Sequence, residues 1–443
     1  MKRESGGLHK IILLILGGSL VLIVWMNYME LSGAPETIQS PPLVTGIAAL
    51  PDIPDQQDSV SAEGNDGLDD IKEGASVLNL TVIGDILPHA GLNTEAKTED
   101  GYDYTKIMSG AQSYIENADF AVASSFETTM PGGPEFSGYP TFKTPDAIAS
   151  SLKALGVDLV NTANDHCMDS YETGLVRTLD VLDQAGLYHV GTYRSREERD
   201  ATSGITFVEQ KGITMAFLSY TFGTNGVSIE EYDFVTNVYA LDYLSNTSNE
   251  INYGMIESDM EAARNLNADI ITVFMHWGQE LQTIPVRQQT ELADFLLEQG
   301  ADIIIGGHPQ VPERMELRKI EEDTSRTGLV VYSLGNFISA HSDILSKISA
   351  IVNVEIVKDN ETGETSIRDA NYIPMIMVDL DDYGIEQTDW RYQLWDLHSA
   401  VDAYDSGYDM GVINYALSEG LKAGLNEIHG IMGRDYDRHH RYG

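Results

Sequence analysis

The sequence predicts an α/β (α+β mixed) fold in which buried strands alternate with helices. Short runs of aliphatic and β-branched residues recur along the chain, and segments with helical spacing lie between them. A third observation concerns strand direction. Residues 350–357 and 365–372 flank a polar segment, 358–364, whose turn chemistry predicts an antiparallel hairpin. We therefore expect a mixed sheet rather than a purely parallel one.

The clearest strands lie between residues 301 and 338. Ala301-Asp-Ile-Ile-Ile-Gly-Gly-His308 and Leu329-Val-Val-Tyr-Ser-Leu-Gly-Asn336 each contain a run too apolar to face water, followed by glycine and a polar side chain. In open sheets flanked by helices, ligands bind outside the carboxyl ends of the strands, because the backbone opens there. The pattern predicts two strands that deliver His308 and Asn336 to a site.

The first half of the folded part begins at Val77. Its helix near residue 144 is predicted to have Thr144 as N-cap and to end at Gly156. A Gly/Pro-rich loop at 131–140 is expected to border a cleft. Strands are predicted at 77–85, 119–127, 157–163 and 188–191, and helices at 104–116, 144–155 and 171–184.

The second half repeats this alternation. Ser258 is the candidate N-cap of one helix, and Gly300 closes another. A less regular acidic insert is expected at about 228–250. Strands are predicted at 213–220 and 270–275, and helices at 259–267 and 286–299.

Residues 381–443 form a separate C-terminal extension in this prediction. Trp390, Leu394 and Leu397 predict one helix, and apolar residues between 413 and 428 predict a second. We interpret the extension as a helical cap on a domain at 77–380, and a helix that binds a partner or a membrane is the alternative. The terminal histidines, His439 and His440, are predicted to be exposed and to have no role.

The composition excludes several classes of protein. Among 443 residues, 27 are Lys or Arg and 69 are Asp or Glu, which gives a net charge of −42. Such a charge repels a nucleic-acid backbone and attracts cations, so we expect no nucleic-acid partner. Cys167 is the single cysteine, which excludes an internal disulfide framework and a cysteine-cluster zinc site. We interpret it as a packing residue, and a reactive or metal-binding thiol is the alternative.

The N-terminus predicts a membrane anchor at residues 1–30. Basic residues precede an uncharged apolar run at 11–26, and Trp25 and Tyr28 have the positions of interfacial anchors. A cleaved signal peptide is the alternative, but Pro35 directly after the small residues 32–34 argues against cleavage. Because the basic end stays inside, we expect a single-pass protein of the cell membrane with its main domain extracytoplasmic. Residues 31–76 are predicted to be a disordered acidic linker.

Several apolar runs along the chain are each followed by one or more polar side chains. They occupy six strand ends, each one to three residues beyond a different apolar run, and Asn164, Asp165 and His166 share one of these ends. We therefore predict that they share one site. These residues are Asp85, Glu127, Asn164, Asp165, His166, His276, His308 and Asn336.

These residue types indicate metal-assisted chemistry. Carboxylates, imidazoles and carboxamides without thiolates suit Mn, Fe, Zn or Mg rather than a structural zinc ion. Asp85 is placed to bridge two divalent ions, and His276 and His308 each supply one neutral nitrogen. Two ions activate a water and hold both oxygens of a displacement at phosphorus or carbonyl carbon. His166 is then free to act as an acid or to stabilise the leaving oxygen.

The same residues carry a resemblance to the CapA family of capsule-synthesis proteins, from about Leu78 to Ser339. The matching motifs are Ile83-Gly-Asp85, Phe142-Lys-Thr-Pro, Gly156-Val-Asp-Leu-Val-Asn-Thr-Ala-Asn-Asp-His166, His276-Trp-Gly-Gln-Glu280, Gly300-Ala-Asp-Ile-Ile-Ile-Gly-Gly-His308-Pro and Tyr332-Ser-Leu-Gly-Asn-Phe337. The resemblance implies a calcineurin-type metallophosphoesterase-like sandwich of two mixed β-sheets flanked by helices. It also implies a role in poly-gamma-glutamate capsule synthesis or export.

Three positions depart from the family pattern. Ser125 occupies the asparagine position of the Asn-x-Glu motif, and Asp165 occupies the asparagine position of the Asn-His pair. Gln310 occupies the position of the second histidine in the Gly-His-x-His motif. Aspartate can replace asparagine as an oxygen ligand, but a neutral carboxamide is a weaker ligand than imidazole. The resemblance implies that Asp165 and His166 are catalytic residues. It implies as metal ligands Asp85, Glu127, Asp165, His276, His308 and Gln310. It implies as substrate-binding residues Lys143, Asn164, Glu280 and Asn336.

Two functions follow from this interpretation. The first is a membrane-anchored, metal-dependent hydrolase or transferase that acts on an anionic polymer or a phosphoester. The second is a non-catalytic scaffold that guides the polymer beside membrane-bound capsule synthase subunits. The net charge of −42 repels a polyanion unless divalent cations or a locally basic cleft screen it.

Overall fold

The computed structural model describes residues 74–245, 250–320, 326–386, 390–407 and 412–442. The predicted anchor at residues 1–30 and nearly all of the predicted linker at 31–76 lie outside these ranges. Among the helices of the described ranges, none combines the length and the apolar character needed to cross a membrane.

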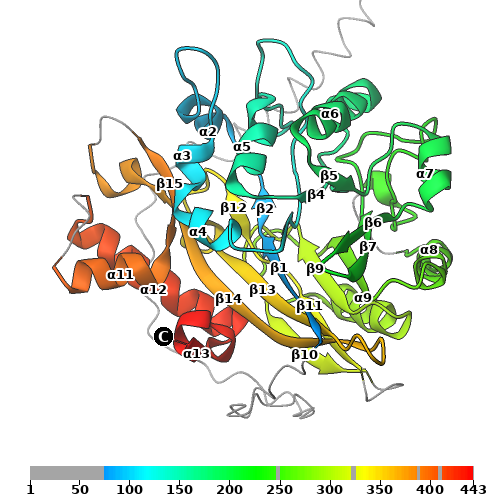
Figure 1. Cartoon of the computed structure of the whole chain (residues 1–443). Coiled ribbons are helices and arrows are strands. Elements are labelled where there is room, and N and C mark those ends of the chain that lie inside the picture. Colours follow the sequence, from blue (N-terminus) through cyan, green and yellow to red (C-terminus); the bar gives the residue numbers. More distant parts are fainter. Residues whose placement is uncertain (1–73, 246–249, 321–325, 387–389, 408–411, 443) are drawn as a thin grey trace, which may run out of the picture. The chain divides into compact units, whose positions relative to one another are not determined.

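Two mixed β-sheets form the centre of the described part, which confirms the predicted mixed α/β class (Figure 1). In the first sheet, β1, β3, β4 and β5 run parallel, and β13 pairs antiparallel with β1 and with β14. Its strands, in spatial order, are β15 (Tyr392–Asp396), β14 (Thr365–Asp379), β13 (Ile348–Lys358), β1 (Ser76–Ile83), β3 (Phe120–Ala123), β4 (Leu159–Asn161) and β5 (Tyr188–Val190).

The second sheet has a parallel centre with an antiparallel strand at each edge. A separate short ribbon pairs β2 (Asp85–Ile86) with β12 (Asn336–Ile338). The strands of the second sheet are β10 (Met315–Lys319), β11 (Thr327–Val331), β9 (Ile303–Gly307), β8 (Ile270–His276), β7 (Ile213–Thr221) and β6 (Thr206–Gln210).

The two sheets pack face to face through one apolar core. Phe120 of the first sheet stacks on Phe217 of the second with ring centroids 5.7 Å apart, and Phe217 stacks on Phe274. The opposite face of each sheet is covered by helices, because each buries a second apolar surface. The helices are α2 (Ala90–Glu95), α3 (Thr105–Met108), α4 (Gln112–Ile115), α5 (Ala147–Leu155), α6 (Tyr171–Ala185), α7 (Arg196–Thr202), α8 (Tyr253–Asn265), α9 (Arg287–Glu298), α10 (Ile344–Lys347), α11 (Leu397–Asp405), α12 (Tyr415–Met432) and α13 (Arg438–Tyr442).

Both predicted N-caps are wrong. The Thr144 hydroxyl is hydrogen-bonded to Thr128 Oγ1 at 2.7 Å, and α5 begins after Asp146 without a side-chain cap. Helix α8 begins five residues earlier than Ser258, behind Asn252, whose Oδ1 accepts a hydrogen bond from Met255 N. At α8 the capping side chain lies outside the periodic pattern, so apolar spacing alone places the start of this helix too late.

The segment 104–116 is not one continuous helix. Helices α3 and α4 are separated by a 3-10 turn, η1 (Ser109–Ala111). A Cβ atom at Gly110 would lie 2.0 Å from the Leu394 carbonyl oxygen, so the turn packs directly against the backbone of β15. This close contact replaces regular helical continuation.

The predicted helix at 390–397 is a strand in its first part. Residues 392–396 form β15, which pairs antiparallel with β14 at the edge of the first sheet. The spacing of Trp390, Leu394 and Leu397 is helical, but Tyr392 and Trp395 are also buried, and the free edge of β14 supplies backbone partners. From residue 415 on, the predicted segment 413–428 is helical and belongs to α12.

Candidate functional site

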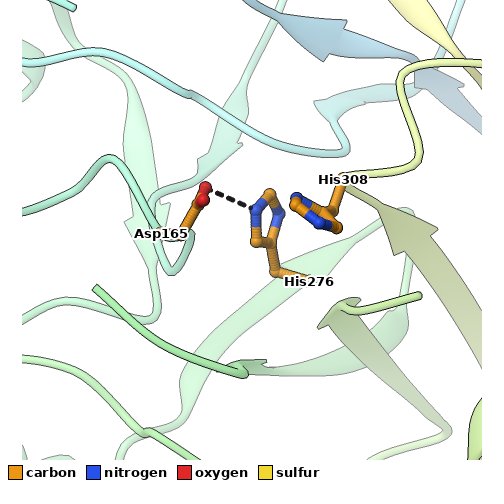
Figure 2. Close-up of side chains that lie close together, drawn as sticks. All are labelled: Asp165, His276 and His308. Atoms are coloured by element: carbon orange, nitrogen blue, oxygen red, sulfur yellow. Dashed lines mark hydrogen bonds and ion pairs between the residues drawn. The ribbon is translucent and has the colours of Figure 1, made fainter. Parts of the chain in front are cut away.

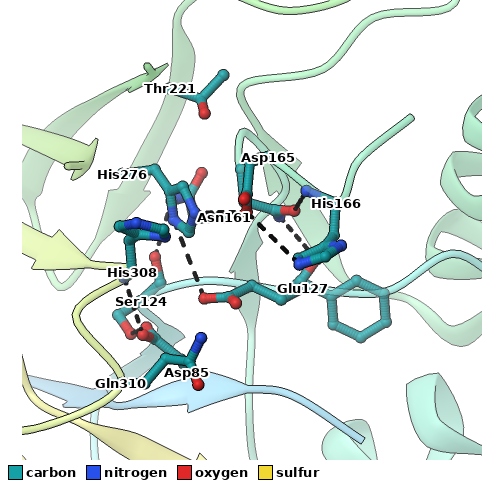
Figure 3. A network of polar contacts seen from close by, with 12 residues as sticks. Asp85, Ser124, Glu127, Asn161, Asp165, His166, Thr221, His276, His308 and Gln310 are labelled. Carbon is teal, nitrogen blue, oxygen red and sulfur yellow. Dashed lines mark hydrogen bonds and ion pairs between the residues drawn. The ribbon is translucent and has the colours of Figure 1, made fainter. Parts of the chain in front are cut away.

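Polar side chains that follow strands of both sheets converge at one place (Figure 3). Asp85 begins β2, Glu127 and Asp165 lie in the loops after β3 and β4, and His276 and His308 lie at the ends of β8 and β9. All five are buried. The predicted meeting of strand ends from distant parts of the chain is therefore present in the structure.

Asp165, His276 and His308 form the centre of the cluster (Figure 2). His276 Nε2 lies 2.9 Å from Asp165 Oδ1, and the two imidazole rings have centroids 4.8 Å apart. Each of the three residues offers a ligand atom, and these atoms lie within 4.8 Å of one another. The three side chains thus have the mutual distances of a metal-binding set.

Asp85 and Glu127 extend the cluster on its carboxylate side. Asp85 Oδ1 accepts a hydrogen bond from Ser124 Oγ at 2.6 Å, and Asp85 Oδ2 accepts one from the His308 backbone N–H at 3.1 Å. Glu127 Oε1 lies 3.9 Å from His276 Nδ1. Within the described residues, neither carboxylate forms an ion pair with lysine or arginine.

The backbone at the end of β9 holds His308 in an uncommon conformation. His308 has a φ of +96° and Gln310 a φ of +60°, both in the left-handed region that disfavours side chains. A Cβ atom at Gly307 would lie 2.7 Å from Asp85 Oδ1, so only glycine allows Asp85 to approach this turn. The glycine pair seen in the sequence therefore positions the cluster.

His166 has its own partner, Asp169. The His166 Nδ1 atom lies 2.8 Å from Asp169 Oδ2, and its Nε2 atom lies 3.8 Å from Asp165 Oδ1. Phe142 packs edge-on against the ring at 4.7 Å. Burial opposes the charged form, but Asp165 and Asp169 outweigh it and raise the pKa of His166 to about 9.

The other pKa shifts indicate that the cluster lacks positive charge. Burial raises the pKa of Asp85 and that of Glu127, and at Glu127 the Asp85 and Asp165 carboxylates add to the effect. Burial also lowers the pKa of His308 to about 3, with His276 acting in the same direction. At Asp165, burial opposes ionisation, but His166 and His276 together lower the pKa. Carboxyl groups and a neutral imidazole are thus held where a cation would stabilise them.

A divalent cation fits this set of residues. Glu127 Oε1 and His276 Nδ1 are buried and have no hydrogen-bond partner among the described residues. An unsatisfied buried polar atom costs about 1–3 kcal/mol, and a metal ligand at this position is satisfied by its ion. Mixed carboxylate and imidazole donors suit Mn, Fe or Zn.

Gln310 and Glu280 contact each other beside the cluster. Gln310 Nε2 donates a hydrogen bond to Glu280 Oε1 at 3.2 Å, and both side chains are more exposed than the buried ligands. The Gln310 amide nitrogen is thus engaged by a carboxylate, which leaves the amide oxygen as the atom available to a cation.

The three remaining predicted substrate-binding residues have other contacts. Asn164 is buried, donates to the Phe126 carbonyl at 2.8 Å and accepts from His166 N, so its amide holds the loop. Asn336 donates to the Gln310 carbonyl at 3.2 Å, and its Oδ1 is buried without a partner among the described residues. Lys143 is tied through its backbone, which pairs with Ser137 and Thr129.

Sequence reasoning missed three residues of the site. Asp169 orients His166, and its position three residues after that histidine was the available signal. Phe222 stacks on His276 at 5.8 Å and contacts His308 at 4.6 Å, and Ser124 holds Asp85. Neither of these two has a signal in one sequence, because an apolar or hydroxyl residue after a strand is common.

Cys167, next to His166, is a packing residue as predicted. Its side chain is buried in the apolar core under the first sheet. Burial raises the pKa of its thiol to about 12, which removes the reactive thiolate at neutral pH.

Residues 79–341 match the model of the family described as bacterial capsule synthesis protein PGA_cap. The match covers more than half of the chain and includes every residue of the cluster. The chain belongs to this family. Its family resemblance to CapA, predicted from the motifs, is thereby confirmed.

Two curated relatives carry related descriptions. The chain is 30% identical over 298 residues to the PGA biosynthesis protein CapA of Bacillus subtilis, covering 66% of this chain and 70% of the relative. It is 25% identical over 296 residues to the capsule biosynthesis protein CapA of Bacillus anthracis, covering 65% of each chain. The alignment thus spans about two thirds of the relatives' length.

Solved structures show weaker likenesses. The NAD nucleotidase of Haemophilus influenzae has 10% identity and a TM-score of 0.41, covering 80% of this chain and 60% of that chain. The calcineurin-like phosphoesterase YfkN of Bacillus subtilis has 11% identity and a TM-score of 0.38, covering 80% and 97%. At these values the likenesses carry no argument about this chain's activity.

Proposed function

We propose that this protein is a metal-dependent hydrolase or transferase of poly-gamma-glutamate capsule synthesis or export. The observation that carries the proposal is the buried cluster of Asp85, Glu127, Asp165, His276 and His308, in which carboxylates lack lysine or arginine partners among the described residues. Membership in the capsule family supports the biological role. The substrate class is an anionic polymer or a phosphoester.

In this proposal, each group of residues in the site has its own role. The five clustered residues hold one or two divalent ions, with Gln310 as a weaker ligand through its amide oxygen. Bound divalent ions supply Lewis-acid polarisation and an activated water. His166, oriented by Asp169 through Nδ1 at 2.8 Å, carries a proton on Nε2 toward the leaving oxygen. Phe142 and Phe222 exclude water from the imidazole faces.

We further propose that residues 1–30 anchor the protein in the cell membrane, with the main domain outside the cytoplasm beside membrane-bound synthase subunits. The basic residues before the apolar run at 11–26 support this orientation. Protease treatment of intact spheroplasts is expected to degrade the domain, and a protected domain contradicts the proposal.

The test of the activity uses the purified full-length chain. We expect bound manganese, iron or zinc by mass spectrometry, and manganese-dependent hydrolysis of a phosphodiester or of poly-gamma-glutamate. His276→Ala and Asp85→Asn are expected to lose metal and at least about 100-fold in rate, because each removes a buried ligand. His189→Ala, at a histidine elsewhere whose side chain is 15% exposed, is the matched control.

The non-catalytic scaffold is the second candidate. Engagement of Gln310 by Glu280 favours it, because one position of the family's ligand set is weakened. A chain that binds poly-gamma-glutamate but holds no metal and hydrolyses neither substrate would establish the scaffold and overturn the enzyme.

A further inference from the structure

A second group of metal-competent side chains lies in the C-terminal part, beyond the residues that match the family. His398 lies near the start of α11, His429 in the last turn of α12, and Asp437 between η4 (Arg434–Tyr436) and α13. His398 Nε2 and His429 Nε2 lie 2.6 and 2.5 Å from the same atom, Asp437 Oδ2. The Asp437 side chain is fully buried, and the two imidazoles are 15% and 14% exposed.

We propose that His398, His429 and Asp437 bind one divalent cation of the zinc type. Zinc prefers imidazole nitrogen and carboxylate oxygen in tetrahedral geometry, and three protein ligands leave one position for water. The ligand atoms of the three residues lie within 4.8 Å of one another. They come from three separate elements, so their convergence is a product of the fold.

The distances allow an ion after a small movement. Ligand atoms around a tetrahedral zinc ion lie ~3.3 Å apart, because each bond is ~2.0–2.2 Å long. The separations here start at 2.5 Å and reach at most 4.8 Å, which brackets that value. Asp437 has to withdraw by less than ~1 Å from the two imidazoles to admit the ion.

Neighbouring groups support the three ligands. The other carboxylate oxygen, Asp437 Oδ1, accepts a hydrogen bond from His439 N at 2.9 Å, which orients the carboxylate. The His439 ring stacks on His398 with centroids 4.3 Å apart. Asp396 and Asp402 lie close enough to His398 to favour positive charge at its ring.

An ion-free arrangement is the alternative. One carboxylate oxygen can accept an N–H from each imidazole, so Asp437 then joins α11 and α12 by hydrogen bonds alone. Both arrangements fasten the last residues of the chain to the helices. They differ in whether a cation contributes to the fastening.

The test separates this site from the cluster of the proposed enzyme. The full-length chain carrying His276→Ala and Asp165→Asn is titrated with Zn²⁺ by calorimetry and with Co²⁺ by visible absorption. We expect one equivalent of zinc, tetrahedral cobalt bands, and a thermal midpoint that rises with zinc and falls with a chelator. Adding His429→Gln is expected to weaken zinc binding about tenfold or more. Adding His440→Gln, a change at an exposed neighbouring histidine, is the matched control and should leave the affinity unchanged.

Each outcome decides the question. Equal zinc affinity with and without His429→Gln, or loss of affinity in the His440→Gln control, overturns the proposal. If the His429→Gln chain does not fold, the parent chain decides through its thermal midpoint. A midpoint that does not move with micromolar zinc also overturns the proposal. None of these results depends on whether the protein hydrolyses a substrate.

Discussion

At the scale of single residues, a buried carboxyl group without a cation is costly wherever it lies. Glu313, outside the cluster around Asp165, is fully buried. Its Oε2 accepts a hydrogen bond from Gln289 Nε2 at 2.6 Å, and its Oε1 has no partner among the described residues. Burial raises the pKa of Glu313 to about 8, although Gln289 and Arg314 act in the opposite direction.

The raised pKa makes the stability of the protein depend on pH. The folded protein holds the Glu313 proton more tightly than the unfolded chain, whose pKa is near 4.5. The contribution of the Glu313 proton to the free energy of unfolding is therefore full below pH 4.5. This contribution is lost as the pH rises to about 8, by about 1.4 kcal/mol for each pH unit. Glu313→Gln should abolish this loss. Urea unfolding at pH 5 and pH 9 measures it, and an equal pH dependence in both proteins contradicts the prediction.

Gln310 provides a test of the proposed metal site. Gln310→His restores an imidazole where the family pattern has one, so we expect tighter binding of manganese by about tenfold. Calorimetry on the full-length chain measures the change. Glu280→Gln is the companion variant, because it removes the carboxylate that engages Gln310 without adding a ligand. Unchanged affinity in Gln310→His places this position outside the ligand shell.

At the scale of elements, the end of β9 shows how closely the strand ends pack. A Cβ atom at Gly306 would lie 1.9 Å from the Tyr332 carbonyl oxygen and 2.3 Å from Trp277 Nε1. Real side chains do not approach so closely, so β9 can deliver His308 only if this position is glycine. The close packing at the end of β9 therefore also positions the site.

Gly306→Ala should destabilise the protein by about 3 kcal/mol or more, since the backbone of β9 has to move. Gly430→Ala is the matched control, because nothing lies within 4 Å of its Cβ position and the residue is in α12. We expect that control to stabilise by about 0.5–1 kcal/mol. Denaturant unfolding compares the two, and equal effects argue against the close packing of β9.

The same scale shows which elements were predictable. Long periodic segments such as α6, α9 and α12 and the hairpin of β13 and β14 follow from local pattern. β15 does not, because its identity comes from the free edge of β14. The start of α8 at Asn252 also depended on a hydrogen bond that apolar spacing does not encode.

At the scale of the whole molecule, the C-terminal helices belong to the main core. Leu417, Leu421 and Ile428 of α12 are fully buried in the same cluster as β13 and β14. β15 extends the first sheet before these helices begin. That residues 381–443 form a part of their own remains a prediction. Because the helices of this part share the main core, a core mutation in α12 tests it.

Leu421→Ala should cost about 2–5 kcal/mol, the usual range for a buried leucine. Leu241→Ala, at a leucine that is 60% exposed, should change stability by less than about 0.5 kcal/mol. Unfolding in denaturant measures both. A small effect of Leu421→Ala would mean that α12 contributes little to the fold.

The sequence alone determined which residues end the strands, the family, and the donor types available to a metal. These features depend on short-range pattern and side-chain chemistry, which one chain displays directly. The tertiary structure decided which of those side chains meet. Asn164 became a loop contact, and the residues around Asp437, beyond the family match, came together, because such contacts join segments whose separation along the chain carries no signal.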